Sequence, residues 1–467
     1  MKHILRKTFL VLAAGIMSSA AWADVLPTPV YFNNFETAVS GSDGIEIVGN
    51  GVFESDADTR FGKIFHNDPG ATPSKEIRKN YLRLPEDVLS HSTTTKEITI
   101  GFWVNVKNAA DFWFSPIFSA YALSPAENAA ESRLGNEGNF PMFVLQSRGL
   151  MQLNNGGWDD FAASDNVNGE NQENTFWLDD KEWHYYTMTM TTSKAIVYVD
   201  GVVFNEWDID GTEAHYVGGF FEYGANYKHI CLGGNQAWNW GDPDPAYGFD
   251  DFAVYDRALS ASQIAQIIAN KIPNATTKIS ETGWSTAAFN YPLDFTTSIT
   301  GLSVYTVTGH TGTAITKAAV TGVVPAGTPL LLNGTASASY TIPVATTAGT
   351  APAGNKLVRG RGAAVDATDG NTTYVLSKEG TKSVFKKIVS GTSPTVAADK
   401  AYLLFTGEAI EARSIDIDGD GTTGINMVNG EGLKVNGSEV YYDLQGRRVL
   451  YPTKGLYIVN GKKVILK

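Results

Sequence analysis

The sequence predicts an all-β protein that begins with a two-layered β-sandwich. Residues 97–106 alternate polar and apolar side chains, as a half-buried strand does. Asp200-Gly201 separates two β-rich runs and is typical of a tight hairpin turn. Convincing helical spacing is confined to residues 260–271, where Ser260 can serve as the N-cap. A short helix that follows many strands favours a β-sandwich over an α/β fold.

The composition describes a folded, acidic chain of 467 residues, long enough for about three domains. Apolar residues make up 43% and aromatic residues 11%, which excludes wholesale disorder. The net charge of −13 argues against a nucleic-acid partner, because neutralising phosphates requires clustered lysines and arginines. The single cysteine, Cys231, can form neither an intramolecular disulfide nor a cysteine-based zinc site. Side-chain packing, with or without a hard metal ion, therefore has to hold the chain together.

Residues 1–23 have the features of a secretory signal peptide. A cationic start is followed by an apolar run over residues 8–17 and by the small residues Ala21 and Ala23. The apolar run is too short to span a bilayer, and no later segment is long and apolar enough to do so. We therefore expect an exported protein whose mature chain has no transmembrane segment.

Composition divides the rest of the chain into zones. Residues 24–272 are aromatic and acidic, and they form the predicted sandwich. Residues 273–413 are rich in Thr, Ala, Gly and Val, which predicts a smaller β domain whose default role is a spacer. Residues 414–438 are interpreted as a linker, because their calcium-loop-like start lacks the required Glu and has Met427 instead. Residues 439–467 predict a short β module.

Three motifs in the first zone resemble laminin-G-like, concanavalin A-like jelly-roll domains. They are the segments 183–186 and 198–201 and the closing segment 249–260. Gln263 departs from the pattern, because the family usually has Glu there. The resemblance implies a jelly-roll β-sandwich for residues 24–272. It does not by itself define a function, since this sandwich carries lectins, adhesins, accessory modules and glycanases.

The same motifs predict side-chain positions. We expect the indole of Trp183 to pack inward, in the core, and His184 to form a hydrogen bond beside it. In the closing strand, Phe252 is expected in the core, while Asp250 and Asp251 stay at the solvated start of the strand.

The resemblance also implies a calcium site at the edge of the sandwich. Domains of this family often hold one calcium with acids from the first and closing strands, which here are Glu36 and Asp250 or Asp251. Calcium takes 6–8 oxygen ligands, so these carboxylates and nearby carbonyls would form part of a shell. Solvated strand ends are the alternative.

Aromatic residues in loop-like segments predict a ligand surface. Trp158, Trp238 and Trp240 lie among Gly, Asn and Asp, a combination that offers flat apolar faces beside hydrogen-bonding groups. Such surfaces suit sugar rings. We therefore expect a binding protein whose partner is a glycan or an extracellular protein. Packing of these tryptophans in the core is the alternative.

An enzymatic alternative depends on Glu206 and Asp210, which strand alternation places on one face together with Asp208. A similar pattern carries retaining hydrolysis in glucanases of this superfold, which needs two carboxyl groups about 5–5.5 Å apart. A polar surface strand explains the same residues. The sequence thus leaves a glycoside hydrolase and a structural or adhesion protein as alternatives to the binding protein.

The terminal module resembles C-terminal sorting domains of the type IX secretion system of Bacteroidetes. Residues 439–467 contain β-rich runs joined by Asn460-Gly461, a strong hairpin signal. The resemblance implies that the secretion machinery is a partner and that the protein is secreted or displayed on the outer cell surface. A last hairpin of the middle domain is the alternative.

Overall fold

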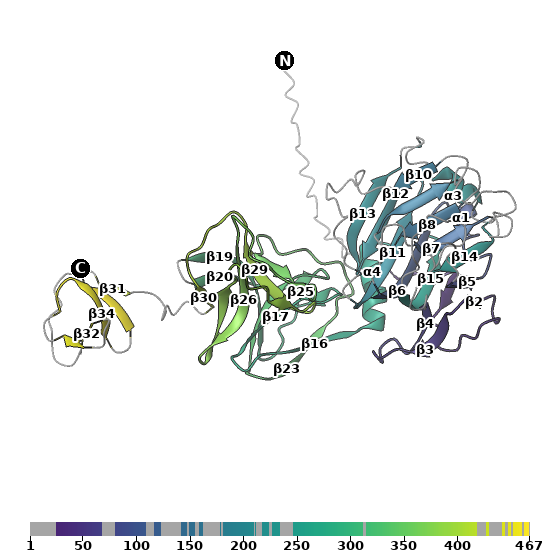
Figure 1. The fold of residues 1–467 in the computed structure, drawn as a ribbon. Coiled ribbons are helices and arrows are strands. Elements are labelled where there is room, and N and C mark those ends of the chain that lie inside the picture. Colours follow the sequence, from purple (N-terminus) through teal and green to yellow (C-terminus); the bar gives the residue numbers. More distant parts are fainter. Residues whose placement is uncertain are drawn as a thin grey trace, which may run out of the picture.

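The computed structural model describes residues 25–67, 80–108, 116–122, 142–146, 149–154, 158–161, 178, 181–209, 211, 217–223, 227–233, 246–311, 314–417, 426–428, 441–443, 447–449, 452–459 and 462–466. These residues form three bodies built almost entirely of β-strands, which follow one another along the chain (Figure 1). The all-β fold class predicted from the sequence is confirmed.

The first body is a sandwich of two antiparallel sheets. Its first sheet has the order β13-β12-β11-β6-β15-β4-β3, with β1 paired to β15. These strands are β1 (Tyr31–Asn33), β3 (Val52–Ser55), β4 (Lys63–Asn67), β6 (Ile98–Asn108), β11 (Trp183–Met190), β12 (Lys194–Val199), β13 (Val202–Asp208) and β15 (Ala246–Tyr255). The closing strand β15 lies inside this sheet, between β6 and β4.

The second sheet of the sandwich has the order β10-β9-β8-β7-β14-β5-β2. Its strands are β2 (Glu46–Val48), β5 (Tyr81–Leu84), β7 (Pro116–Tyr121), β8 (Met142–Gln146), β9 (Met151–Asn154), β10 (Trp158–Phe161) and β14 (His229–Leu232). Two short helices accompany the sandwich, α1 (Ser92–Thr95) and α3 (Gly218–Tyr223).

The core between the two sheets follows the alternation of the strands. Tyr186, Met188 and Met190 of β11 all lie in it, as the sequence predicts. Trp183 does not, because it shares the opposite face of β11 with Tyr185. The Trp183 indole is buried, as expected, but it packs in a second core on that opposite face rather than between the two sheets.

The helix α4 (Ala261–Lys271) follows β15 directly. Ser260 accepts a hydrogen bond from the backbone N–H of Gln263, and the Gln263 side chain accepts one from the backbone N–H of Ser260. This reciprocal capping box fixes the start of the helix. Gln263, the departure noted in the sequence, therefore completes the capping box.

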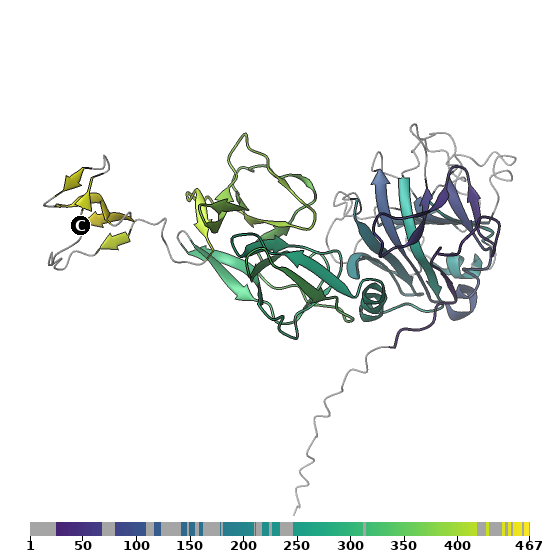
Figure 2. The ribbon, with the colours of Figure 1, turned by 90° about the horizontal axis from the view of Figure 1, so that it is seen from below.

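A second core joins the first body to the middle one. It contains Phe61, Trp103 and Trp183 from the outer side of the first sheet, Ile264 and Ile268 from α4, and apolar residues of the middle body that begin at Ala275. Figures 1 and 2 show α4 between the two bodies. The central part of the outer face of the first sheet is therefore an interdomain face.

The middle body is a nine-stranded sheet accompanied by three two-stranded ones. The large sheet has the order β17-β22-β19-β20-β30-β27-β26-β29-β24. The end strand β17 also contacts β29, which lies next to the other end of the sheet: the Thr286 hydroxyl donates to the carbonyl of Ala401 at 3.0 Å and accepts from its N–H at 3.1 Å. The strands of the large sheet are β17 (Trp284–Ala287), β19 (Leu302–Thr311), β20 (Ala314–Ala319), β22 (Leu330–Gly334), β24 (Leu357–Arg359), β26 (Thr372–Glu379), β27 (Lys382–Lys387), β29 (Ala401–Phe405) and β30 (Ser414–Asp416). The small sheets pair β16 (Asn274–Lys278) with β23 (Ser339–Pro343), β18 (Leu293–Asp294) with β21 (Val323–Val324), and β25 (Ala363–Ala364) with β28 (Thr395–Val396).

The terminal body is a five-stranded sheet of its own, with the order β31-β35-β34-β32-β33. Its strands are β31 (Asn426–Val428), β32 (Tyr441–Tyr442), β33 (Arg448–Val449), β34 (Gly455–Val459) and β35 (Lys462–Leu466). The interval 414–438 contributes β30 to the middle sheet and β31 to this one. Among the described residues, none of the helices has the length and apolarity needed to cross a membrane.

Candidate functional site

The second sheet carries the outer face of the sandwich that the interdomain core does not use. Along its strands, core residues alternate with residues of that outer face, as in Leu82, Arg83 and Leu84 of β5, where only Arg83 lies outside the core. Other outer-face residues with described side chains include Glu46, Val48, Tyr81, Ser119, Tyr121, Met142, Val144, Gln152, His229 and Cys231. The face is mixed aromatic and polar in composition.

Strand register arranges the outer-face positions in rows across the sheet. One row runs from Arg83 through Cys231, Ser119 and Val144 to Gln152. The middle of this row is buried, with Ser119 fully enclosed, whereas the Arg83 side chain at its end is 34% exposed. The functional groups of this row that solvent can reach therefore lie at the edge formed by β5 and β2.

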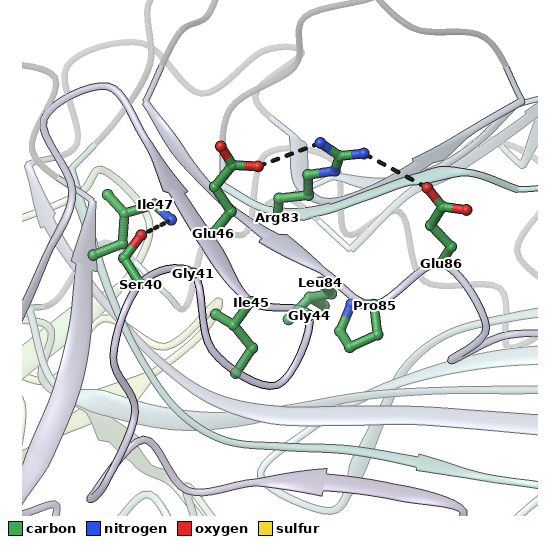
Figure 3. Close-up of a pocket in the computed structure, with 10 residues that line it drawn as sticks. All are labelled: Ser40, Gly41, Gly44, Ile45, Glu46, Ile47, Arg83, Leu84, Pro85 and Glu86. Atoms are coloured by element: carbon green, nitrogen blue, oxygen red, sulfur yellow. Dashed lines mark hydrogen bonds and ion pairs between the residues drawn. The ribbon is translucent and has the colours of Figure 1, made fainter.

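A pocket of about 520 Å³ opens at that edge (Figure 3). A tight turn forms one wall, in which Gly41 and Gly44 have φ of +84° and +75°, and Gly44 lies against Pro85 so closely that a Cβ would stand 3.0 Å from its ring. Glycine tolerates this left-handed backbone and this approach. Beside it, the backbone N–H of Ile47 donates to the Ser40 hydroxyl at 2.9 Å.

The rim of the pocket is an arginine held between two carboxylates. The Arg83 guanidinium lies 3.3 Å from Glu46 and 3.6 Å from Glu86, as Figure 3 shows. Lys228 adds a second cation 3.9 Å from Glu86. The pocket combines these hydrogen-bonding groups with the half-buried apolar side chains of Ile47 and Pro85. Its size is that of a small-molecule site.

Cys231 lies on the same face but has no reactive character. The thiol is buried, and burial raises its pKa to about 12. A nucleophilic cysteine needs a lowered pKa and access to solvent, so this thiol acts as a small packing group.

The predicted metal ligands Asp250 and Asp251 do come together, around a lysine. The register of β15 on β6 shifts between Asp250 and Ala253, and Asp251 has φ of +48°. This bulge turns both carboxylates toward Lys271, the last residue of α4, whose Nζ lies 2.6 Å from Asp250 and 3.1 Å from Asp251.

The expectation that Asp250 stays solvated was wrong, because it is fully buried. Burial, together with the neighbouring Asp251, raises the pKa of Asp250 to about 7, while Lys271 opposes that rise. Glu36 lies close by: burial raises the pKa of Asp251, and the charge of Glu36 adds to the rise. One Glu36 oxygen accepts the backbone N–H of Lys63 at 3.2 Å.

These residues do not fit the predicted calcium ion as they stand. The lysine ammonium already occupies the position between the two aspartates that a cation would take. Within the described part of the chain, no group of three or more His, Cys, Asp or Glu side chains is arranged to hold a metal ion.

Glu206, the predicted catalytic acid or nucleophile, lies on the outer side of β13. Trp207 beside it is buried in the core between the sheets, which confirms the alternation along this strand. Lys194 pairs with Glu206 and also with Asp208, at 3.4 Å for the latter. Asp210 lies outside the described residues, so the predicted carboxylate pair stays a prediction.

Of the three tryptophans predicted to bind a ligand, only Trp158 lies among the described residues. Trp158 begins β10 and pairs with Asn154 of β9. This is the edge of the second sheet opposite to β2. Trp238 and Trp240 lie outside the described residues. Sequence reasoning missed Glu46, Arg83 and Glu86, although an arginine flanked by two leucines in a strand signals a charge that the core excludes.

Comparison with known families now identifies the fold of the first body. Residues 77–265 match the family model of the concanavalin A-like lectin/glucanases superfamily. The sandwich is thus a concanavalin A-like domain, as its motifs predict. No curated protein matches the chain.

Several solved structures resemble the chain at low identity. Domain 4 of an extracellular arabinanase from Geobacillus stearothermophilus, in complex with arabinotriose, is 16% identical, covers 51% of this chain and 96% of that one, and has a TM-score of 0.33. Botulinum neurotoxin type C is 11% identical over 59% of this chain and 56% of that one, with a TM-score of 0.31. A sialidase from Trypanosoma rangeli is 17% identical over 51% of this chain and 32% of that one, with a TM-score of 0.28.

Proposed function

We propose that the protein is an exported carbohydrate-binding protein and that the pocket at the β2–β5 edge of its concanavalin A-like domain holds the sugar. The observation that carries the proposal is the Arg83 guanidinium, fixed between Glu46 and Glu86 at the rim of a pocket with apolar walls. Sugar hydroxyls both donate and accept hydrogen bonds, and sugar ring carbons pack on apolar side chains.

Charge distribution supports a neutral sugar in preference to an acidic one. Two carboxylates flank the guanidinium, so the rim carries no excess positive charge for an anionic ligand. The side chains of Glu46 and Glu86 are each 54% exposed, so hydroxyl groups of a ligand can reach both carboxylates.

A glycan array probed with the chain lacking residues 1–23 tests this function, followed by calorimetry with the best glycan. We expect Arg83→Ala to weaken binding roughly 10-fold or more, because a hydrogen bond to a charged group is lost. Arg257→Ala is the matched control, since Arg257 is an exposed arginine paired with Asp256 on the same domain. Silence on every glycan, together with binding to an extracellular matrix protein, would instead favour adhesion.

Trp158→Ala in the same titration tests the aromatic prediction separately. Trp158 lies at the opposite edge of the second sheet from the pocket, so a loss of affinity in this variant would reveal a second contact region. Unchanged affinity would restrict the site to the β2–β5 edge.

We further propose that residues 1–23 direct export and that the terminal body is a sorting signal of the type IX kind. A separate five-stranded sheet at the end of the chain supports a module that another protein recognises. Because β31 pairs with β35, a clean test deletes residues 418–467 rather than 439–467 alone. We expect the shortened protein to remain in the periplasm, whereas unchanged surface delivery would contradict the sorting role.

A further inference from the structure

The carboxylates of the closing strand converge on one ammonium group. The β15 bulge brings Asp250 and Asp251, which are consecutive in the chain, to the same side, where Lys271 reaches both. On a regular strand, consecutive side chains would point to opposite faces. The bulge and the end of α4 are therefore matched to each other.

The surroundings make this cation hard to replace. Asp250 is fully buried, and the side chains of Lys271 and Asp251 are each only 16% exposed. The Lys271 ammonium also lies 5.4 Å from the centre of the Phe61 ring, an arrangement that favours a cation. Two adjacent buried carboxylates with no cation between them would repel each other and remain poorly solvated.

Both Asp250 oxygens, and one oxygen each of Asp251 and Glu36, already have partners. Asp250 accepts the backbone N–H of Asp251 on one oxygen and Lys271 on the other. Glu36 accepts a backbone N–H from Lys63. Calcium requires 6–8 oxygen ligands, so its entry would have to expel the lysine and break these bonds.

We propose that Lys271 supplies the cation of this sandwich edge from within the chain, so that the edge binds no calcium. Lys271 ends α4, and the first strand of the middle body, β16, begins at Asn274. The ion pair therefore also fastens the interdomain junction to the closing strand. A bound metal ion could hold the edge together but would not link it covalently to the next body.

Thermal unfolding of the chain lacking residues 1–23 tests the proposal, in EDTA and in excess calcium chloride. We expect the same Tm in both. A Tm that rises with calcium in the wild type but not in Asp251→Asn would overturn the proposal. A rise that persists in Asp251→Asn comes from a site elsewhere and leaves the proposal standing.

Substitution of Lys271 supplies a second test of the proposal. Lys271→Met keeps the length of the side chain and removes the charge, and we expect it to lower Tm by roughly 10 °C. Lys278→Met, at an exposed lysine of β16, is the matched control and should leave Tm near the wild-type value. If Lys271→Met does not fold, Lys271→Arg should, because it retains a cation. Equal Tm values for Lys271→Met and Lys278→Met would refute the role of the ion pair.

Discussion

At the scale of single residues, the hairpin aspartate explains why His184 has a structural role. His184 Nδ1 lies 2.7 Å from an Asp200 carboxylate oxygen, and the other oxygen accepts the Tyr185 backbone N–H at 2.9 Å. Both side chains are buried. Asp200 also has φ of +58°, which aspartate and asparagine tolerate better than most residues.

Asp200→Asn should therefore retain the turn and weaken the buried contacts. We expect the free energy of unfolding to fall by about 1–3 kcal/mol, because a charged acceptor is lost inside the protein. Urea denaturation followed by tryptophan fluorescence measures it. Asp208→Asn, at an exposed aspartate, should change stability by less than about 0.5 kcal/mol. Similar losses in the two variants would contradict the structural role of the pair.

Buried acidic groups predict a loss of stability at high pH. Burial raises the pKa of Tyr255 from its ordinary 10.0 to about 12, with Asp251 adding to the rise, and burial raises that of Cys231 from 9.0 to about 12. The folded state thus holds these protons more tightly than the unfolded state does. The contribution of these two protonated groups to the free energy of unfolding is therefore complete below pH 9 and is lost as the pH rises toward 12. Tm measured across this interval should fall, and Tyr255→Phe should flatten the fall; an identical profile would contradict it.

At the scale of elements, local sequence signals were enough to predict the helix and the turn. Features that depend on how distant strands pair could not be predicted. The helix over α4 and the Asp200-Gly201 turn were predictable, because capping and turn preferences depend on residues close in sequence. The burial of Asp250 was not, because it follows from a bulge in the pairing of β15 with β6, strands far apart in the chain. The pocket at Arg83 was missed for the same reason, since β2 and β5 meet only in the fold.

The capping box of α4 gives a prediction for an element. Ser260→Ala should lower the free energy of unfolding by about 1 kcal/mol, since the N–H of Gln263 loses its acceptor. Gln263→Glu should be nearly neutral, because a carboxylate can still accept the N–H of Ser260. Denaturation of both variants and of Gln263→Ala measures this. If Gln263→Glu proves as costly as Gln263→Ala, the reciprocal cap is not what stabilises the helix.

At the scale of the whole molecule, the first two bodies share a core that the composition does not reveal. The shift in composition near residue 272 coincides with the end of α4 and the change of sheets. Trp183 and Ile268 nevertheless pack in one cluster with residues of the middle body such as Leu330. The middle body therefore covers part of one face of the concanavalin A-like domain. It does more than separate the domains, which is the spacer role that the sequence predicts.

Truncation tests this shared core. A chain of residues 24–272 should expose the outer face of the first sheet, bind a hydrophobic dye and aggregate. A chain of residues 24–417 retains the cover and should stay monodisperse in size-exclusion chromatography. Equal behaviour of the two chains would show that the interface contributes little.

Hydrogen–deuterium exchange with and without the best array glycan shows whether the sugar binds at the β2–β5 edge, because it locates the ligand on the intact protein. Protection on binding should concentrate in residues 40–47 and 81–86, around Arg83. Protection confined to residues 194–208 of the first sheet, beside Glu206, or to the terminal body, would contradict it.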